Sequence, residues 1–176
     1  MSRQHLYTGK SGQLAVMAEF VSRGYNVAVP EVDVGDDIFI IRDQDGELSR
    51  VQVKTANARE LPGGGFSAVF KLSERRLRTP QRPEMNYLLA VRYRESWRDF
   101  VVITRAELSE IHGMHGIGRD VGGSVLFVLV FSEGDVLCVK QSLQAYRNNW
   151  SKWPAIDHGA KLAPDFPDAP EDAGQG

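Results

Sequence analysis

An acid, an amide and a lysine are spaced so that a β-hairpin would bring them together. Asp37 lies at the start of one β-rich run, and Gln52 and Lys54 lie near the end of the next. The dipeptide Asp45-Gly46 between the two runs favours a tight two-residue hairpin turn. Counting outward from that turn places Asp37 directly opposite Lys54, with their Cβ atoms about 4.5 to 5.5 Å apart.

The period of two along a strand assigns these side chains to faces of the sheet. Gln52 lies two residues from Lys54, so both are predicted on the face that carries Asp37. The neighbouring Asp36 is then sent to the opposite face, beside Thr55. A three-residue loop would shift the register by one residue and bring Asp36 to the site instead.

A carboxylate, an amide oxygen and an ammonium group on one face suit metal-dependent hydrolysis of a phosphodiester. Mg²⁺ prefers oxygen ligands and keeps several waters, so the side chains of Asp37 and Gln52 and the carbonyl of Val53 could hold it. Lys54 could position or deprotonate the attacking water and offset negative charge on the phosphate, provided that burial and a nearby cation lower its pKa.

A helix upstream offers a second carboxylate. Helical spacing of apolar residues predicts a helix over residues 14–23, with Gly24 as its end. Glu19 borders the apolar stripe of this helix, so it could lean toward the sheet and act as a further metal ligand. The alternative is a solvated surface glutamate. The stripe consists of Leu14, Met17, Ala18 and Val21.

The remaining elements predict an α/β fold with a mixed sheet flanked by helices. The hairpin strands lie within residues 36–43 and 47–55, and a further strand is expected within 61–72. Other strands are predicted at 25–30, 86–93, 99–103, 124–131 and 135–139. Further helices are predicted within 72–83, at 104–111 with Thr104 as its N-cap, and at 142–153.

The order of Glu19 on a helix, Asp37 at a strand start and Gln52-Val53-Lys54 on the next strand resembles the PD-(D/E)XK nuclease superfamily. Restriction endonucleases, Holliday-junction resolvases and some homing endonucleases belong to it. The resemblance covers roughly residues 9–95 and implies a restriction-endonuclease-like core of helix, three strands, helix and strand. It also implies that Glu19, Asp37 and Gln52 are metal ligands and that Lys54 is the catalytic lysine.

Two positions depart from the pattern of that superfamily. Asp36 stands where the motif has proline, and Gln52 stands where it has its second acid. An amide oxygen ligates a cation without contributing charge, so the affinity for Mg²⁺ is expected to be lower than with glutamate.

Length and composition limit the number of domains and the class of protein. The chain has 176 residues with 21 basic and 23 acidic side chains, which excludes a basic surface of histone type. One nuclease-like domain is predicted over residues 1–163. Residues 164–176 hold four acids and no lysine or arginine among prolines and glycines, so they are predicted to be a disordered tail.

Cellular location is predicted from what the sequence lacks. No run approaches the roughly 18 apolar residues of a membrane span, and the N-terminus has no apolar stretch of signal-peptide type. The lone Cys138 rules out an internal disulfide and argues against a cysteine-rich zinc site. We therefore expect a soluble cytoplasmic protein without membrane association.

Positive charge is concentrated in one region. Of the 21 basic residues 15 are arginines, whose planar forks suit phosphate. A basic segment could grip the nucleic-acid backbone, and the alternative is a solvated helix face. Its members are Lys71, Arg75, Arg76 and Arg78.

Three further patterns carry weaker signals. Tyr146, Trp150 and Trp153 recur at helical spacing, which favours a helix anchored to the core over a base-stacking platform. His112 and His115 are interpreted as part of a flexible glycine-rich loop, because no partner acid lies at zinc-site spacing. The glycines of 63–65 lack the lysine of a phosphate-binding P-loop and predict a turn.

These observations predict a Mg²⁺-dependent endonuclease acting on DNA, with Mn²⁺ as a possible substitute for Mg²⁺. A homodimer is expected by analogy with nucleases that cut two strands. The alternative is a non-catalytic module that keeps the fold with a degenerate metal site and binds nucleic acid or a protein partner.

Overall fold

The computed structural model describes residues 3–32 and 35–158, so the predicted tail from residue 164 lies outside the described residues. The helix α1 spans Arg3–Ser22 and begins well before the predicted start. It ends before Gly24, whose φ of +88° fits the predicted helix end. No described helix has the combination of length and apolarity that crossing a membrane requires.

The buried face of α1 differs from the predicted one. Leu14 and Val21, predicted to face the core, are 52% and 60% exposed. The buried residues recur every four positions and are Thr8, Gly12, Val16 and Phe20. Gly12 explains the difference, because a Cβ there would lie 2.2 Å from Cγ2 of Thr55. The helix approaches the sheet most closely at its glycine, and this contact decides which face is buried.

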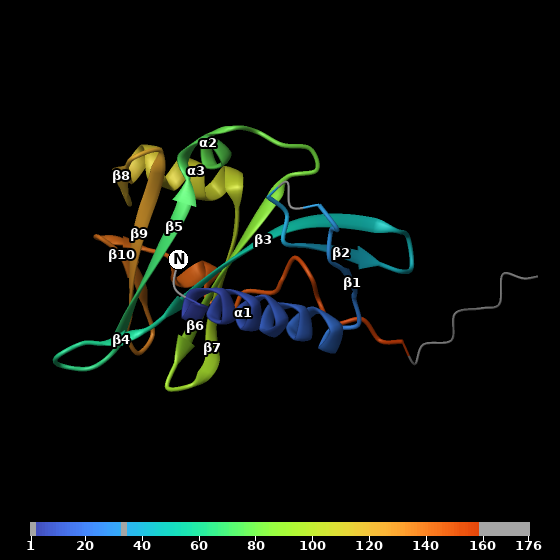
Figure 1. The fold of residues 1–176 in the computed structure, drawn as a ribbon, viewed down its shortest axis with the longest axis horizontal. Helices are drawn as coiled ribbons and strands as arrows, with labels where there is room; N and C mark the ends of the chain where they lie inside the picture. Colours follow the sequence, from blue (N-terminus) through green and yellow to red (C-terminus); the bar gives the residue numbers. More distant parts are fainter. Residues whose placement is uncertain (1–2, 33–34, 159–176) are drawn as a thin grey trace, which may run out of the picture.

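The first sheet is mixed, as predicted, with the strand order β1-β2-β3-β6-β7. Its strands are β1 (Asn26–Ala28), β2 (Ile38–Arg42), β3 (Glu47–Asn57), β6 (Met85–Tyr93) and β7 (Ser96–Thr104). The pairing of β3 with β6 is parallel, and the other pairs in this sheet are antiparallel. The long β3 crosses the centre of the molecule in Figure 1 and is the strand on which the predicted site lies.

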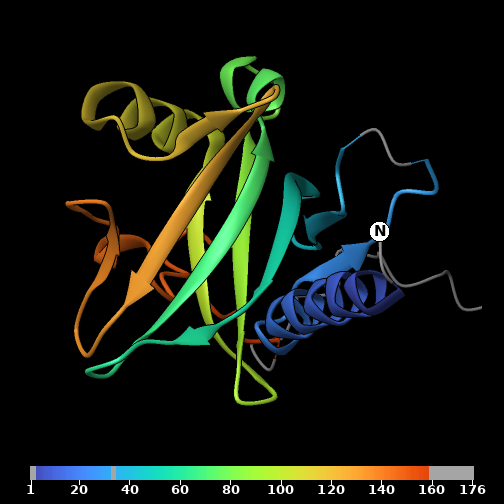
Figure 2. The same ribbon diagram turned by 60° about the vertical axis from the view of Figure 1, so that its left-hand side comes forward.

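A second sheet, with the order β11-β10-β9-β5-β4 and β8 beside β9, covers one face of the first. Its strands are β4 (Arg59–Glu60), β5 (Phe66–Ser73), β8 (Arg119–Val121), β9 (Ser124–Phe131), β10 (Val136–Cys138) and β11 (Gln141–Ser142). In Figure 2, β5 and β9 run side by side in front of β6 and β7. The predicted turn at 63–65 joins β4 to β5, with the N–H of Leu61 donating to the carbonyl of Gly65.

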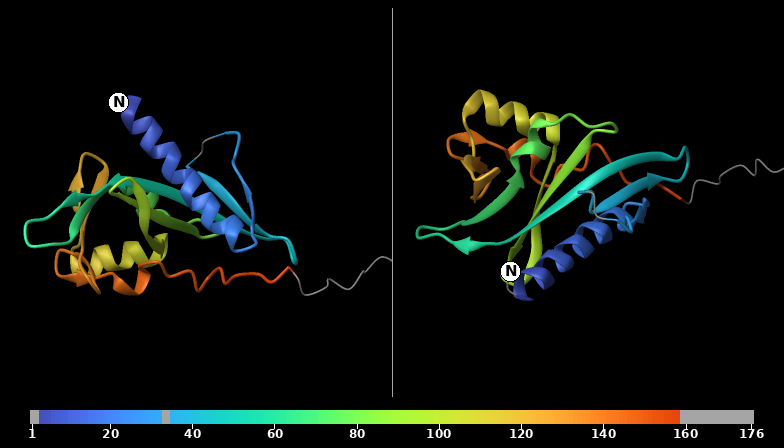
Figure 3. Two further views of the ribbon diagram at one scale, coloured as in Figure 1. Left: turned by 90° about the horizontal axis from the view of Figure 1, so that it is seen from below. Right: turned by 45° about the horizontal axis from the view of Figure 1, so that its top comes forward.

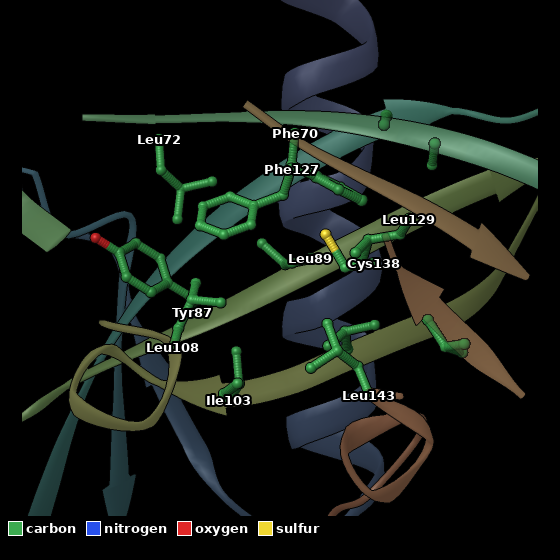
Figure 4. Close-up of a cluster of buried hydrophobic side chains, with 14 of the residues drawn as sticks. Phe70, Leu72, Tyr87, Leu89, Ile103, Leu108, Phe127, Leu129, Cys138 and Leu143 are labelled. Atoms are coloured by element: carbon green, nitrogen blue, oxygen red, sulfur yellow. The ribbon is translucent and has the colours of Figure 1, made fainter. Parts of the chain in front are cut away.

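The two faces of the first sheet carry separate apolar cores. Figure 3 shows α1 on one side of this sheet and the second sheet with α3 (Arg105–His115) on the other. Side chains of β5, β6, β7 and β9 fill the space between the sheets, with Phe70, Tyr87 and Phe127 among the largest (Figure 4). The second core lies under α1.

The prediction of a C-terminal helix at 142–153 is wrong, although aromatic residues of this segment do anchor it to the core. Only the short 3₁₀ turn η1 (Gln144–Tyr146) forms there. Trp150 and Trp153 are buried, and the ring of Phe20 from α1 packs edge-on against both at 5.5 and 5.0 Å. These contacts with α1 hold the segment in an irregular path.

The helix α3 follows the predicted cap and extends past the predicted end. Thr104 and Glu107 form a reciprocal capping box. The helix includes His112 and His115, so the flexible-loop interpretation of both is wrong. His112 is buried and its Nδ1 contacts the carbonyl of Ile117, which explains why the histidine is held in the helix.

The predicted hairpin forms with a different turn. The pairs Ile38↔Val51 and Arg42↔Glu47 leave the four residues 43–46 as the loop. The Arg42 guanidinium contacts the carboxylates of both Asp45 and Glu47, which favours this wider turn. The prediction of a two-residue turn is therefore wrong, and the register differs from it by two residues. Because two is an even number, the side chains within the paired strands keep their predicted faces.

Candidate functional site

The register gives Asp37 a different cross-strand neighbour from the predicted one. The backbone N–H of Asp37 donates to the carbonyl of Val51 at 3.0 Å, just before β2 begins. The pair Ile38↔Val51 differs by two residues from the predicted register, and Asp37 itself lies outside the ladder of β2. The predicted direct pairing with Lys54 is therefore wrong.

The Asp37 carboxylate lies at the edge of β3. Its Oδ2 accepts a hydrogen bond from the backbone N–H of Val53 at 2.7 Å. Because the N–H groups of a strand lie in the plane of the sheet, this oxygen sits beside β3 where β2 no longer covers it. The carbonyl of Val53 leaves the strand toward the same uncovered edge.

The alternation of β3 distributes the neighbouring side chains as predicted. Val51 and Val53 face the core under α1. Gln52 and Lys54 leave the opposite face, where Gln52 is only 5% exposed and Lys54 is half-buried. Asp37 is not placed on that face, because it lines a pocket with Val53 and Thr55, and neither Gln52 nor Lys54 lines this pocket.

An open pocket of about 280 Å³ lies beside Asp37 on the side of α1. Its lining includes Leu6, Lys10, Gln13, Asp37, Val53 and Thr55. The Nε2 of Gln13 donates to the backbone carbonyl of Asp37 at 2.7 Å, and Lys10 in turn donates to Oε1 of Gln13 at 2.9 Å. Sequence reasoning missed Gln13, because the helix was predicted to begin after it.

The structure does not bring Glu19 to this pocket. Its carboxylate lies 3.8 Å from the Arg23 guanidinium and is 39% exposed. Six residues separate it from Gln13, which is about 9 Å along the helix axis. Within residues 3–32 and 35–158, no group of three or more His, Cys, Asp or Glu side chains is arranged to hold a metal ion.

Asp36 does not lie where it was predicted. Its buried carboxylate makes two hydrogen bonds to the Arg50 guanidinium, at 3.0 and 2.9 Å. Arg50 shares the face of Gln52 and Lys54, so Asp36 reaches this face and not the one beside Thr55. The reason is that Asp36 precedes the regular strand, where the alternation of side chains does not apply.

A larger cavity of about 370 Å³ opens beside this ion pair. Its lining includes Arg50, Arg75, Arg76, Thr79, Gln81 and Arg82. Two of these arginines were predicted to bind nucleic acid and lie in α2 (Glu74–Arg78), and Arg50 and Arg82 were missed because they lie outside that basic segment.

The other two predicted phosphate-binding residues lie away from this cavity. Lys71 is exposed on β5. Arg78 donates to Glu74 at 3.0 Å within α2. The basic segment is therefore divided, and part of it joins residues from β3 and from the loop before β6.

Asp37 and Val53 line one pocket, whereas Gln52, the third predicted ligand, is not among the residues that line it. The side chains of Asp37 and Gln52 and the carbonyl of Val53 offer only oxygen ligands, with one negative charge among them. A carboxylate has about four lone-pair sites, so the bond from Val53 does not exhaust its capacity.

Comparisons with known proteins bear on the fold. No protein-family model and no curated protein matches the chain. A solved structure of a bacterial homing endonuclease, I-Ssp6803I, is similar to it with a TM-score of 0.52 and 21% sequence identity, over 86% of this chain and 93% of that one. The fold is nuclease-like. The expected core is present as α1, β1 to β3, α2 and β6, with β4 and β5 inserted before α2.

Proposed function

We propose that this chain is a divalent-metal-dependent endonuclease of the PD-(D/E)XK type that hydrolyses DNA phosphodiester bonds. The observation that carries the proposal is the bond from the Val53 N–H to the Asp37 carboxylate at 2.7 Å. It fixes an acid at the edge of β3, at the residue that separates Gln52 from Lys54 in the sequence.

In this proposal Asp37, Gln52 and the Val53 carbonyl hold Mg²⁺ or Mn²⁺. When bound, the cation polarises the phosphate and lowers the pKa of a coordinated water. The Val53 N–H keeps the carboxylate in one orientation, and Gln13 holds the backbone of Asp37. The Lys54 ammonium positions the attacking water and offsets negative charge that develops on the phosphate.

The similarity to a homing endonuclease structure supports DNA as the substrate class. The arginine-lined cavity on the Gln52 face of β3 supports a polyanionic ligand. A homodimer would supply two copies of the site for two strands, so we include it in the proposal.

The test is a cleavage assay on supercoiled plasmid, single-stranded DNA and branched DNA. We expect nicked or linear products with Mg²⁺ or Mn²⁺ and none with a chelator. Asp37→Ala and Lys54→Ala should each lower the rate by about 100-fold or more. Asp43→Ala is the matched control, because Asp43 is exposed in the hairpin turn. Cleavage that persists in both site variants would reject this site.

A second candidate function is a non-catalytic module with a degenerate metal site. The position of Glu19 beside Arg23 favours it, because the pocket then has a single carboxylate. Calorimetric titration with Mn²⁺ separates the two functions. Binding that disappears in Asp37→Ala supports the nuclease, and a wild-type chain that binds no Mn²⁺ supports the module.

A further inference from the structure

We infer that the 370 Å³ cavity binds a phosphate of the nucleic-acid backbone at a distance from the bond that is cut. This inference deepens the proposed function and depends on it only for the identity of the bound strand. Four arginines from three separate segments border the cavity. They are Arg50 on β3, Arg75 and Arg76 on α2, and Arg82 in the loop before β6.

The charges around this cavity are unbalanced. Asp36 pairs with Arg50, and no described carboxylate forms a salt bridge with Arg75, Arg76 or Arg82. Among the described acids of α2 and of the loop before β6, Glu74 pairs with Arg78 and Glu84 pairs with Arg105. Like charges that converge on one cavity repel each other, and a bound anion relieves this repulsion.

Two of the four guanidinium groups are held in place before any ligand arrives. Asp36 fixes Arg50 through both of its carboxylate oxygens. The Arg76 guanidinium packs against Gly35, where a Cβ would lie 2.0 Å from Nη1. Gly35 also has a φ of +107°, which side chains other than hydrogen rarely permit. Because the guanidinium groups of Arg50 and Arg76 are already ordered, binding a ligand costs less side-chain entropy.

The chemistry of the lining favours phosphate. Guanidinium groups bind phosphate oxygens through paired N–H donors, and charge-assisted bonds of this kind are roughly twice as strong as neutral ones. The hydroxyl of Thr79 and the amide of Gln81 add neutral hydrogen-bonding groups at the same cavity.

The position of the cavity indicates which phosphate it holds. Arg50 lies on β3 on the face that carries Gln52 and Lys54. Four residues of strand separate Arg50 from Lys54, which is about 13 Å at 3.3 Å per residue. That length corresponds to about four nucleotides at 3.4 Å each along one DNA strand. A strand cut beside Lys54 therefore passes the arginines about four nucleotides away.

The test measures DNA binding without cleavage, by fluorescence anisotropy of a labelled duplex in EDTA over a range of salt concentrations. The variant Arg75→Gln/Arg82→Gln removes two exposed charges and leaves the Asp36–Arg50 pair intact. We expect affinity to fall tenfold or more, on the order expected for the removal of charge-assisted hydrogen bonds. The slope of log K against log salt should fall by about 0.9 for each phosphate that the variant no longer neutralises.

Two further variants control for charge and for folding. Arg119→Gln removes an exposed arginine on β8 that does not line the cavity, and it should leave the slope unchanged. Arg82→Lys keeps the charge without the planar fork, so it should recover the slope and only part of the affinity. Thermal melting of each variant checks that it is folded.

Titration with inorganic phosphate distinguishes the backbone from a small phosphate ligand. One outcome would overturn the inference: inorganic phosphate binds through Arg75 and Arg82, but the salt dependence of DNA binding is the same in the wild type and the double variant. An unchanged slope without phosphate binding would also overturn it. A reduced slope in a chain that cuts no DNA would support the cavity while rejecting the proposed nuclease, so the two failures are distinguishable.

Discussion

The carboxylate of Asp37 accepts the backbone N–H of Val53, the residue that separates Gln52 from Lys54. This bond ties the acid of one strand to the centre of the motif on the other. It replaces the direct Asp37–Lys54 pairing expected from a two-residue turn. It also sets the Val53 carbonyl and the carboxylate on one uncovered edge of β3.

Asp37→Asn should weaken metal binding while preserving the fold. The amide oxygen of asparagine can still accept the Val53 N–H, but the negative charge that holds a cation is removed. We expect the affinity for Mn²⁺ to fall at least about tenfold, which is 1.4 kcal/mol. Calorimetric titration measures the affinity, and a wild-type affinity in this variant would show that the cation binds elsewhere.

Gln52→Glu should strengthen metal binding. The change converts a neutral amide into a second carboxylate within the proposed set of metal ligands. A second negative charge near the cation should raise the affinity for Mg²⁺ by about tenfold or more, since unit charges 4 Å apart attract by about 4 kcal/mol at an effective dielectric of 20. Mg²⁺ titration of both chains checks this, and an equal or weaker affinity would place Gln52 outside the coordination sphere.

Asp36→Ala should destabilise the protein strongly. The Asp36 side chain is 3% exposed and the Arg50 side chain is 20% exposed, so the variant leaves a partly buried cation without its partner. Loss of one member of such a pair costs about 3 to 5 kcal/mol. Urea denaturation measures this loss. The control Asp43→Ala changes an exposed acid and should shift the free energy of unfolding by less than about 0.5 kcal/mol.

Gly12→Ala and Gly9→Ala should have opposite effects on stability. A methyl group at Gly12 meets Thr55 and Trp97, whereas nothing lies within 4 Å of a Cβ at Gly9. Overpacking at Gly12 should cost about 1 to 3 kcal/mol. Gly9→Ala should stabilise the helix by about 0.5 to 1 kcal/mol. Thermal unfolding of both variants tests whether α1 docks at Gly12, and equal shifts would contradict this docking.

The wild-type protein should lose stability at alkaline pH because of Tyr87, and Tyr87→Phe should remove this loss. Burial raises the pKa of Tyr87 from 10.0 to about 12. Between pH 10 and 12 the unfolded chain therefore loses the phenol proton while the folded chain keeps it, so stability falls as the pH rises through this range. Two pKa units correspond to about 3 kcal/mol.

The measurement for Tyr87 is the free energy of unfolding in urea at pH 9, 10, 11 and 12, with these values chosen around the two pKa values. The wild type should become progressively less stable relative to Tyr87→Phe as the pH rises across this range. Tyr7→Phe is the control, because the Tyr7 side chain is 73% exposed. A constant difference between wild type and Tyr87→Phe would show that the phenol ionises without cost in the folded state.

Local patterns in the sequence determined most of the elements. Alternating apolar residues identified the hairpin strands, and Thr104 identified the start of α3. The period of two also placed Gln52 and Lys54 on one face of β3. These features depend on residues close together in the chain, where backbone geometry and side-chain sterics act alone.

Only the tertiary structure decided which of these groups meet. The contacts of Arg42 favour a wider turn, which separates Asp37 from Lys54, and Gly12 rather than the apolar stripe determines the buried face of α1. The cavity arginines of β3 and α2 are more than twenty residues apart in the chain and meet because β3 and β6 pair in parallel. Such contacts depend on packing between distant segments, and the local pattern of a sequence does not encode the distances that packing sets.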